Sequence, residues 1–133
     1  MDRELIEALG VTQHYLHEEH LKQLVEARRR EKAYTKGKAP EITGKVAILV
    51  DDGIATGATI EAAINAVKEE LPSKIIVATS VAPPSTVERL KKLADDVIVS
   101  SEPEPFYAIG EFYVDFPQVS DEEVIKVLKE ANK

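Results

Sequence analysis

The spacing of hydrophobic residues changes near residue 46 of the chain. Before that point, apolar residues recur at helical spacing in a strongly charged background, which predicts a short helix around residues 5–9 and a longer one from about Leu16 to Tyr34. Residues 35–45 then carry two glycines, one proline and three lysines. This composition predicts a mobile loop between the charged helices and the rest of the chain.

From Val46 onward, apolar runs alternate with segments of helical spacing. The runs VAILV (46–50), KIIVATSV (74–81) and DVIVS (96–100) predict three strands. The first run is apolar on both faces and the second reads as another buried strand, a pattern typical of parallel strands covered by helices.

Helices are predicted between and after these strands. Residues 58–70 have helical spacing and follow the first strand directly. Ser85 with Glu88, and Ser120 with Glu123, have the spacing of a capping box, in which each side chain bonds the backbone N–H of the other residue. We therefore predict one helix that opens at Ser85 and a last helix that opens at Ser120.

Strands that alternate with helices over short connections predict parallel crossovers, and hence an α/β fold with a doubly wound parallel sheet. Three strands are few, because the mean sheet has about five or six. We therefore expect the sheet to be incomplete. We take residues 1–133 as a single domain, with a charged helical arm and mobile loop at 1–45 and an α/β core at 46–133.

The charge and composition narrow the class of partner. The 133-residue chain has a formal net charge of −7, whereas a nucleic acid or an anionic membrane requires a basic surface. A phosphorylated small molecule stays compatible, because backbone N–H groups bind phosphate without formal charge. The chain has no cysteine, its first residues are too charged for a signal peptide, and no apolar run approaches the ~20 residues that span a bilayer. We expect a soluble cytoplasmic protein.

The first strand leads into the most informative stretch, VAILVDDGIATGAT at residues 46–59. In open α/β sheets, ligands bind beyond the carboxyl ends of the strands. Asp51 and Asp52 lie at that end, where two neighbouring carboxylates can accept hydrogen bonds from two adjacent hydroxyls. The acidic pair therefore predicts a position for a vicinal diol.

The turn after the acidic pair predicts a phosphate site. Gly53 and Gly57 permit positive φ angles and the close approach of a ligand. Successive N–H groups of residues 55–59 at a helix N-terminus suit an anion, and Thr56 and Thr59 add hydroxyl donors. Hydroxyls next to a phosphate describe a phosphorylated sugar.

Each half of this stretch also has an ordinary structural explanation. Glycine-rich turns commonly join strands to helices, and aspartates commonly cap helices, but their combination after an apolar strand is more specific. Two rival motifs are excluded. The phosphate loop of nucleotide triphosphatases needs a lysine that this turn lacks, and the dinucleotide fingerprint needs two glycines two residues apart, whereas Gly53 and Gly57 are four apart.

With these residues, VAILVDDGIATGAT resembles the phosphoribosyl-pyrophosphate (PRPP) motif of the type I phosphoribosyltransferases. Residues 81–90 and 103–124 resemble a group of predicted phosphoribosyltransferases whose substrate base is generally unassigned. The resemblance implies a fold of that type and the transfer of a phosphoribosyl group from PRPP to a nitrogenous base, as in nucleotide salvage.

The resemblance also implies roles for the residues of the motif. Asp51 and Asp52 would hold the ribose 2- and 3-hydroxyls and stabilise positive charge that develops on the ribose, which makes them the catalytic candidates. Mg²⁺ would arrive on the oxygens of the substrate, without a dedicated protein site. The 5-phosphate of PRPP or of a ribose 5-phosphate-type ligand would lie in the turn, whose candidate residues are Gly53, Ala55, Thr56, Gly57, Ala58 and Thr59.

Aromatic residues between 106 and 116 are candidates for the base site. The family places a base-binding hood near here, and Phe106 and Tyr107 are the best candidates to stack on a nitrogenous base. A satellite hydrophobic core or a contact in a homodimer explains the same residues equally well.

Family features that normally precede the motif are missing. Residues 1–45 contain no buried strand and no loop that would grip pyrophosphate; Lys36 and Lys38 lie where the family has a lid loop but suit a solvated loop. We therefore expect a truncated chain, a chain completed by a partner, or a binder without catalysis. The alternatives to an enzyme are a non-catalytic phosphoribosyl-ligand sensor and an interaction domain that dimerises through its charged helices.

Other clusters in the charged helices are interpreted as solvated. His14, His17 and His20 step round a helix, so the three cannot meet at one metal ion. The arginine run at 28–30 has acidic residues nearby, which favours an exposed, ion-paired face over a phosphate site.

Overall fold

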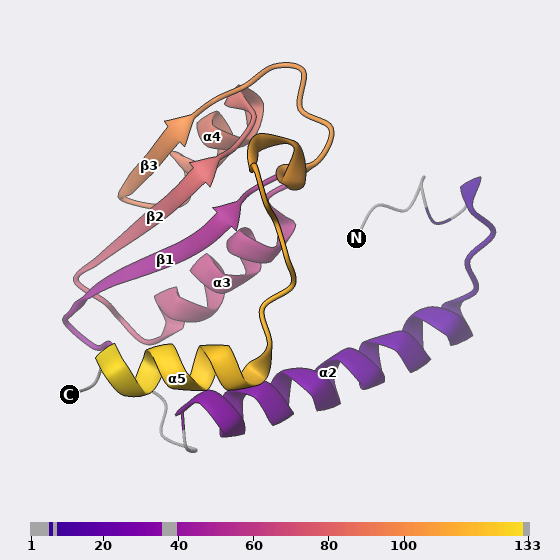
Figure 1. The fold of residues 1–133 in the computed structure, drawn as a ribbon, viewed down its shortest axis with the longest axis horizontal. Helices are drawn as coiled ribbons and strands as arrows, with labels where there is room; N and C mark the ends of the chain where they lie inside the picture. The colour runs from indigo at the N-terminus through magenta and orange to yellow at the C-terminus, as the bar shows by residue number, and fades with distance from the viewer. Residues whose placement is uncertain (1–5, 7, 36–39, 132–133) are drawn as a thin grey trace. The chain divides into compact units, whose positions relative to one another are not determined.

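The computed structural model describes residue 6 and residues 8–35 and 40–131. The chain divides into two compact units, one formed by residues 41–118 and the other by residues 1–40 together with 119–133. The first is an α/β unit, and the second contains two long helices (Figure 1).

Three parallel strands form the sheet of the α/β unit, at the positions that the sequence predicts. Val50 of the first strand pairs with Ala78 of the second, which pairs with Ile98 of the third. The α/β class with a parallel sheet is therefore confirmed, and the carboxyl ends of the strands gather at one edge (Figure 1). The strands are hydrogen-bonded in the order β1 (Val46–Gly53), β2 (Lys74–Val81) and β3 (Asp96–Ser101).

Two helices cover one face of this sheet, α3 (Ala58–Glu69) and α4 (Pro84–Leu90). Each follows a strand, so each begins at the edge where the carboxyl ends of the strands lie. Burial of one such aliphatic side chain contributes about 1.5–3 kcal/mol relative to exposure. The shared core contains Ile60 and Ile64 of α3, Val87 and Leu90 of α4, and Ile75 and Val77 of β2.

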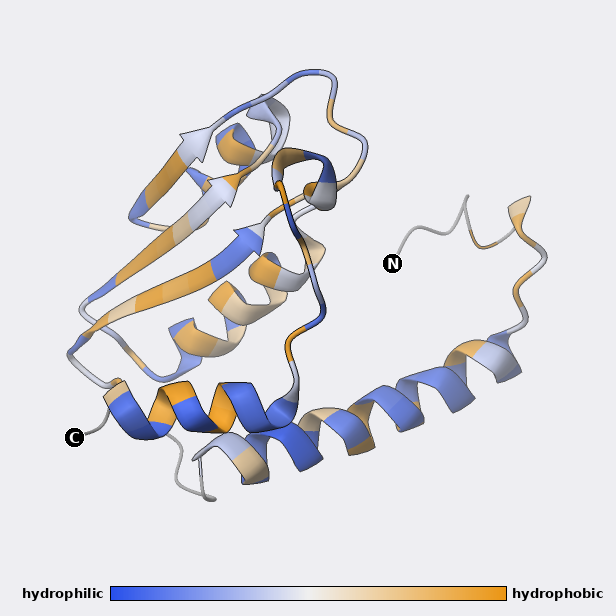
Figure 2. Ribbon diagram, in the orientation of Figure 1, coloured by the Kyte–Doolittle hydropathy of each residue, from blue (hydrophilic) through white to orange (hydrophobic). Residues whose placement is uncertain are grey.

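The opposite face of the sheet is exposed. Val46, Ile48 and Val50 of β1 are 52%, 59% and 75% exposed, and Ile98 of β3 is 56% exposed. The prediction that the first strand is buried on both faces is therefore wrong for the described residues. Side chains alternate along a strand, and only every second one meets the helices. Figure 2 shows the hydrophobic residues that run along β1 and β2.

Helix α4 has its N-cap two residues earlier than the sequence predicts, and it lacks the expected capping box. Pro83 is the N-cap and Pro84 the first helical residue, and no side chain caps the helix. Proline suits this first position because an N–H there would have no partner in the helix, and because its φ is already near the helical value. The predicted start at Ser85 is therefore wrong.

After β3, the chain of the α/β unit continues as an irregular segment that contains one short 3₁₀ helix, η1 (Ile109–Phe112). This segment carries the aromatic residues that the sequence suggests for a base site. It returns to the carboxyl end of the sheet, where η1 lies close to the end of β1.

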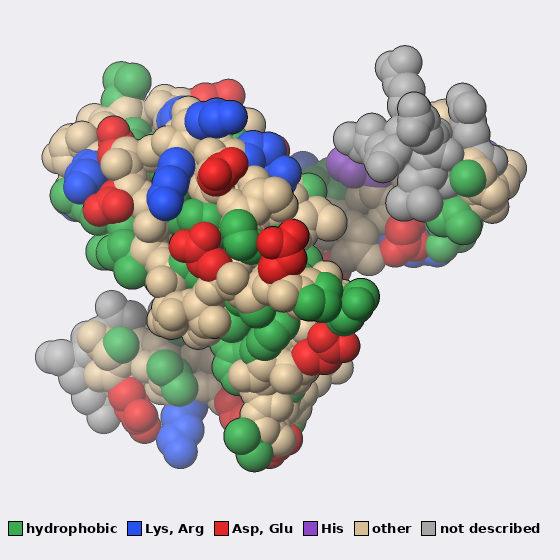
Figure 3. Space-filling model, turned by 90° about the horizontal axis from the view of Figure 1, so that it is seen from above, with side chains coloured by type: hydrophobic (Ala, Val, Ile, Leu, Met, Phe, Trp, Pro, Cys, Tyr) green, Lys and Arg blue, Asp and Glu red, His purple; other side chains and the backbone are tan. Residues whose placement is uncertain are grey.

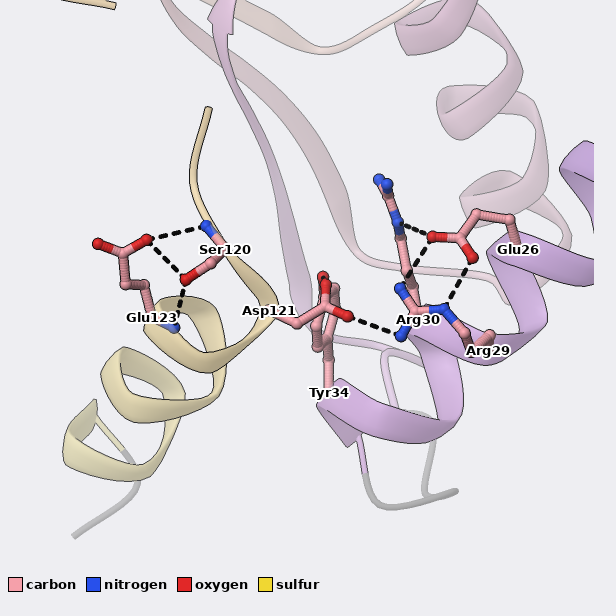
Figure 4. Close-up of polar contacts among 7 residues, drawn as sticks. All are labelled: Glu26, Arg29, Arg30, Tyr34, Ser120, Asp121 and Glu123. Carbon is pink, nitrogen blue, oxygen red and sulfur yellow. Dashed lines mark hydrogen bonds and ion pairs between the residues drawn. The ribbon is translucent and has the colours of Figure 1, made fainter. Parts of the chain in front are cut away.

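The helical unit contains α2 (Gln13–Thr35) and α5 (Asp121–Ala131). The long charged helix of the sequence prediction is confirmed by α2, which buries none of its residues and is largely hydrophilic (Figure 2). The second capping box is also confirmed. The Ser120 Oγ accepts a 3.4 Å hydrogen bond from the Glu123 N–H, and the Glu123 carboxylate accepts a 2.8 Å bond from the Ser120 N–H (Figure 4).

Polar contacts join α2 to α5. The guanidinium of Arg29 lies 2.6 Å from the carboxylate of Asp121, which also accepts a hydrogen bond from the hydroxyl of Tyr34 (Figure 4). Glu26 pairs with Arg29 and with Arg30, each at 2.7 Å. The predicted ion-paired face of the arginine run is therefore confirmed for these two arginines.

Some predictions fall outside the described residues. Lys36 and Lys38 of the expected loop lie there, and so do residues 5 and 7 of the short helix expected around residues 5–9, of which Ile6 and Ala8 are helical. In the described part of the chain, no helix combines the length and the apolar character that crossing a membrane requires.

Candidate functional site

The acidic pair lies inside β1, near its carboxyl end. Because β1 continues to Gly53, Asp51 and Asp52 are strand residues and their side chains leave the strand on opposite sides. Asp51 is half-buried, whereas Asp52 is exposed. The Asp51 carboxylate accepts a 3.0 Å hydrogen bond from the Asp52 backbone N–H.

The electrostatic surroundings of Asp51 are unfavourable to negative charge. Burial raises the pKa of the Asp51 carboxyl, and the negative charge of Asp52 raises it further. The hydrogen bond from the Asp52 N–H acts in the opposite direction with a smaller effect. Among the described residues, no cation lies within ion-pair distance of either carboxylate. A ligand that donates hydrogen bonds would relieve this repulsion.

Two glycines shape the turn after the acidic pair, for different reasons. Gly57 has a φ of 76°, in the left-handed region, and is the N-cap of α3. Gly53 has no positive φ, so that part of the prediction is wrong; instead, a Cβ on Gly53 would lie 2.4 Å from the Cγ2 of Ile109. The segment after β3 thus closes against β1, and Tyr113 there donates a 2.7 Å hydrogen bond to the backbone oxygen of Asp52.

The turn leaves a row of backbone N–H groups without a protein acceptor. Among the described residues, none accepts a hydrogen bond from the N–H groups of Ala55, Thr56, Gly57 or Thr59. The N–H of Ala58 has only a long contact of 3.5 Å to the Thr56 hydroxyl. Amides in the first turn of a helix lack intrahelical acceptors and carry the positive end of the helix dipole. These donors are therefore available to an anion.

The acidic pair and the free N–H groups line one cavity of about 230 Å³. Its wall consists of residues 51–60 and Ile109. The structure therefore brings together all the candidate residues from Asp51 to Thr59 around one cavity, whose lining combines hydrogen-bond acceptors with donors. On the surface toward which the strands point, acidic side chains of the α/β unit stand next to hydrophobic ones (Figure 3).

The two aromatic candidates lie in a neighbouring cavity. Phe106 and Tyr107 line a space of about 520 Å³, together with residues of the β2–α4 connection, the first turn of α4 and Glu104. Ala55 and Thr56 line both cavities. The structure thus places the candidates for base stacking beside the turn, although outside the first cavity.

Four of the aromatic rings pack against each other in pairs, whereas Tyr107 is exposed. Phe106 packs on Phe112 with 5.1 Å between ring centroids, and Tyr113 packs on Phe116 at 5.0 Å. Tyr107 is 78% exposed and contacts no other ring among the described residues. The rings therefore form small aromatic contacts among themselves, and stacking on a base and a contact in a homodimer stay predictions.

Two side chains of α4 contact the turn, and the sequence analysis missed both. The Thr86 hydroxyl donates a 2.8 Å hydrogen bond to the carbonyl oxygen of Ala55, and the Arg89 guanidinium donates to the carbonyl oxygen of Thr56. The partners are 31 and 33 residues apart, so no local spacing signals the contacts. They arise because β2 pairs with β1 and delivers α4 beside the turn.

The described residues hold no group of three His, Cys, Asp or Glu side chains placed to bind a metal ion. His14, His17 and His20 are all exposed on α2, and His14 lies 3.4 Å from Glu18.

Similarity to known proteins identifies the family. The sequence profile of the phosphoribosyl transferase domain matches residues 9–117. The chain belongs to the phosphoribosyl transferase family. Two relatives, from Mycobacterium tuberculosis strains CDC 1551 / Oshkosh and H37Rv, are both named "Putative phosphoribosyl transferase"; each is 38% identical to this phosphoribosyl transferase chain over 113 residues, or 84% of its length. The family resemblance predicted from the motif is therefore confirmed.

A solved structure shares the fold of this phosphoribosyl transferase domain. The crystal structure of TT1426 from Thermus thermophilus is 41% identical, with a TM-score of 0.75 over 90% of this chain. The chain spans 58% of that protein and about a quarter, 26%, of the two Mycobacterium tuberculosis relatives.

Proposed function

We propose that this phosphoribosyl transferase domain binds PRPP and transfers its phosphoribosyl group to a nitrogenous base. The observation that carries the proposal is the single cavity that joins Asp51 and Asp52 to the free N–H groups of the turn. PRPP requires the same two kinds of partner, acceptors for its ribose hydroxyls and donors for its 5-phosphate. Membership of the family supports this class of ligand.

Binding would use both ends of the cavity. The ribose hydroxyls would donate to the carboxylates of Asp51 and Asp52, and the 5-phosphate would accept from the N–H groups of residues 55–59 and from the hydroxyls of Thr56 and Thr59. Hydrogen bonds to charged groups contribute about 1.5–3 kcal/mol each, so the loss of one partner is measurable.

In the transfer, the bond between the anomeric carbon and the pyrophosphate oxygen breaks, and its electron pair leaves with pyrophosphate. A nitrogen lone pair of the base forms the new bond to the anomeric carbon, and the base then loses a proton to solvent. Positive charge develops on the ribose in between, where the negative charges of Asp51 and Asp52 would stabilise it. Ala55 has no titratable side chain, so the turn itself does not take the proton at that position.

Mg²⁺ and the nitrogenous base are the remaining partners of the proposed reaction. Mg²⁺ keeps several of its waters and binds phosphate oxygens readily, so we infer that it would enter on PRPP rather than on a protein site. The base would lie in the cavity beside the turn, where Phe106 and Tyr107 line the wall and Tyr107 offers an exposed ring face for stacking.

Calorimetric titration with ribose 5-phosphate, and then with PRPP and Mg²⁺, tests binding. We expect saturable binding of both ligands and shifts of the amide resonances of residues 51–59. Pyrophosphate release with a panel of bases then tests the transfer. Binding without release would favour the non-catalytic sensor, and failure to bind either ligand would contradict the proposal.

A further inference from the structure

Two side chains of helix α4 donate hydrogen bonds to the backbone of the turn between β1 and α3, from outside the cavity that Asp51 and Asp52 line. Thr86, only 3% exposed, donates to the carbonyl oxygen of Ala55, and Arg89 donates from its Nη2 to the carbonyl oxygen of Thr56. Arg89 also donates from its Nε to the carboxylate of Glu61, in the first turn of α3. Neither Thr86 nor Arg89 lines the cavity that holds the acidic pair.

These two contacts fix the direction of two backbone donors. In a planar trans peptide unit, the C=O of one residue and the N–H of the next point in opposite directions. The bond to the Ala55 carbonyl therefore orients the N–H of Thr56, and the bond to the Thr56 carbonyl orients the N–H of Gly57. Among the described residues, both N–H groups lack an acceptor.

The turn also packs directly on both side chains. A Cβ on Gly57 would lie 2.9 Å from the Nη2 of Arg89 and 3.2 Å from the Cγ2 of Thr86. Together with its φ of 76°, this proximity means that a residue without a side chain fits best between the turn and α4.

We propose that Thr86 and Arg89 are positioning residues of the phosphate site, which hold the backbone of residues 55–57 in its anion-binding conformation before a ligand arrives. This role rests on the proposed function. Glu61 directs the Arg89 guanidinium toward the turn, so that Arg89 acts through the backbone of the turn and not on the phosphate itself. Donors that are already oriented bind more tightly, because the ligand does not have to order them.

Replacement of Thr86 tests the role with little change of shape. Thr86→Val removes the hydroxyl at nearly constant volume and is expected to raise the Kd for ribose 5-phosphate about fivefold, the effect of losing one hydrogen bond. Thr86→Ser keeps the donor and should bind within about twofold of the wild type. If wild type and Thr86→Val bind equally well, the positioning role of Thr86 is overturned.

Arg89→Gln removes the second contact, and Lys91→Gln is its matched control because Lys91 is exposed at the end of α4 and has no contact with the turn. We expect Arg89→Gln to weaken ribose 5-phosphate binding about tenfold and Lys91→Gln to change it less than about twofold. If Arg89→Gln weakens binding without altering the amide resonance of Gly57 in the free protein, Arg89 contacts the phosphate directly and the positioning role is wrong.

The amide spectrum of the unliganded protein distinguishes failure of this inference from failure of the proposed function. Thr86→Val should shift the resonance of Thr56, and Arg89→Gln that of Gly57, because each variant loses the bond that orients that peptide unit, whereas the resonance of Lys68 near the end of α3 should stay in place. If the wild type binds no ribose 5-phosphate, the proposed function fails. These resonances still decide the positioning role, which unchanged Thr56 and Gly57 signals would overturn.

Discussion

Acidic side chains have opposite surroundings in the two units of the chain. In the helical unit, Glu26 accepts hydrogen bonds from Arg29 and Arg30, which lower its pKa to about 2 (Figure 4). In the α/β unit, burial and the charge of Asp52 raise the pKa of Asp51. The protein therefore stabilises the ionised form of Glu26 and destabilises the ionised form of Asp51.

This difference separates acids that hold structure together from acids that are candidates for binding. Asp121 resembles Glu26, because Arg29 and Tyr34 lower its pKa while the same contacts join α5 to α2. An acid without such partners stays ionised at a cost until donors arrive, which is the condition expected of a ligand site.

The strongest test of the comparison removes the negative charges of the acidic pair. Asp51→Asn combined with Asp52→Asn should weaken ribose 5-phosphate binding by more than about tenfold, or ~1.4 kcal/mol, because the amides replace the charged acceptors of the ribose hydroxyls. Calorimetry measures the change. Glu69→Gln combined with Glu70→Gln removes the same charge at the other end of α3 and should leave affinity unaltered. Equal loss in both double variants would show a general effect of charge and would contradict the ribose assignment.

The pH dependence of binding sharpens the same contrast. Because the pKa of Asp51 is raised, its carboxylate protonates at a higher pH than that of an ordinary aspartate. Ribose 5-phosphate affinity should therefore drop severalfold as the pH falls through the raised pKa of Asp51. Asp52→Asn removes the like charge and should move the drop to lower pH. Asp51→Asn removes the titration of Asp51 alone and serves as the control for calorimetry at each pH. A drop that Asp51→Asn leaves unchanged would rule out Asp51 as its source.

A satisfied acid should matter to structure and not to the ligand. Arg29→Gln removes a partner of both Glu26 and Asp121, so hydrogen exchange in α5 should become faster while ribose 5-phosphate affinity stays constant. Arg28→Gln is the matched control, because no ion pair of Arg28 is found among the described residues. Slower or unaltered exchange in Arg29→Gln would mean that these contacts do not hold α5.

The smallest effect is expected from the acid titration of Glu26. Its pKa is lowered from 4.5 to about 2, so its contribution to folding is complete above pH 4.5 and disappears as the pH falls through about 2. The raised pKa of Asp51 acts in the opposite direction, because the cost of its charge disappears on protonation. Hydrogen exchange of α2 in this range should respond to pH in the wild type and less in Glu26→Gln. Identical pH responses would exclude Glu26 as a cause.

Local sequence patterns correctly predicted the elements that depend on neighbouring residues alone. The three apolar runs became β1, β2 and β3, and the spacing of Ser120 and Glu123 became a capping box. Ser85 and Glu88 have the same spacing but form no cap, because Pro84 already begins the helix. The exposed face of β1 was missed because an apolar run does not show which of its faces will find a cover.

The sequence likewise predicts the part of the candidate site that lies in one contiguous segment, and not the residues that other elements contribute. The residues from Asp51 to Thr59 are contiguous, so their hydrogen-bonding capacity is visible in the sequence, and the structure places them around one cavity. Thr86, Arg89 and Tyr113 reach the same site from other elements. Their contribution depends on strand pairing and on the path of the chain after β3, which neither spacing nor composition encodes.

Gly53 lies at a point of the site where the structure leaves no room for a side chain. With a methyl group at this position 2.4 Å from Ile109, the strand end and the 3₁₀ helix could not keep their present separation. A larger residue there would require the side chain of Ile109 to move, four residues before the tyrosine whose hydroxyl donates to the backbone oxygen of Asp52. The missing side chain of Gly53 thus leaves the space in which the end of β1 and the segment after β3 meet, at the wall of the cavity proposed to hold the sugar.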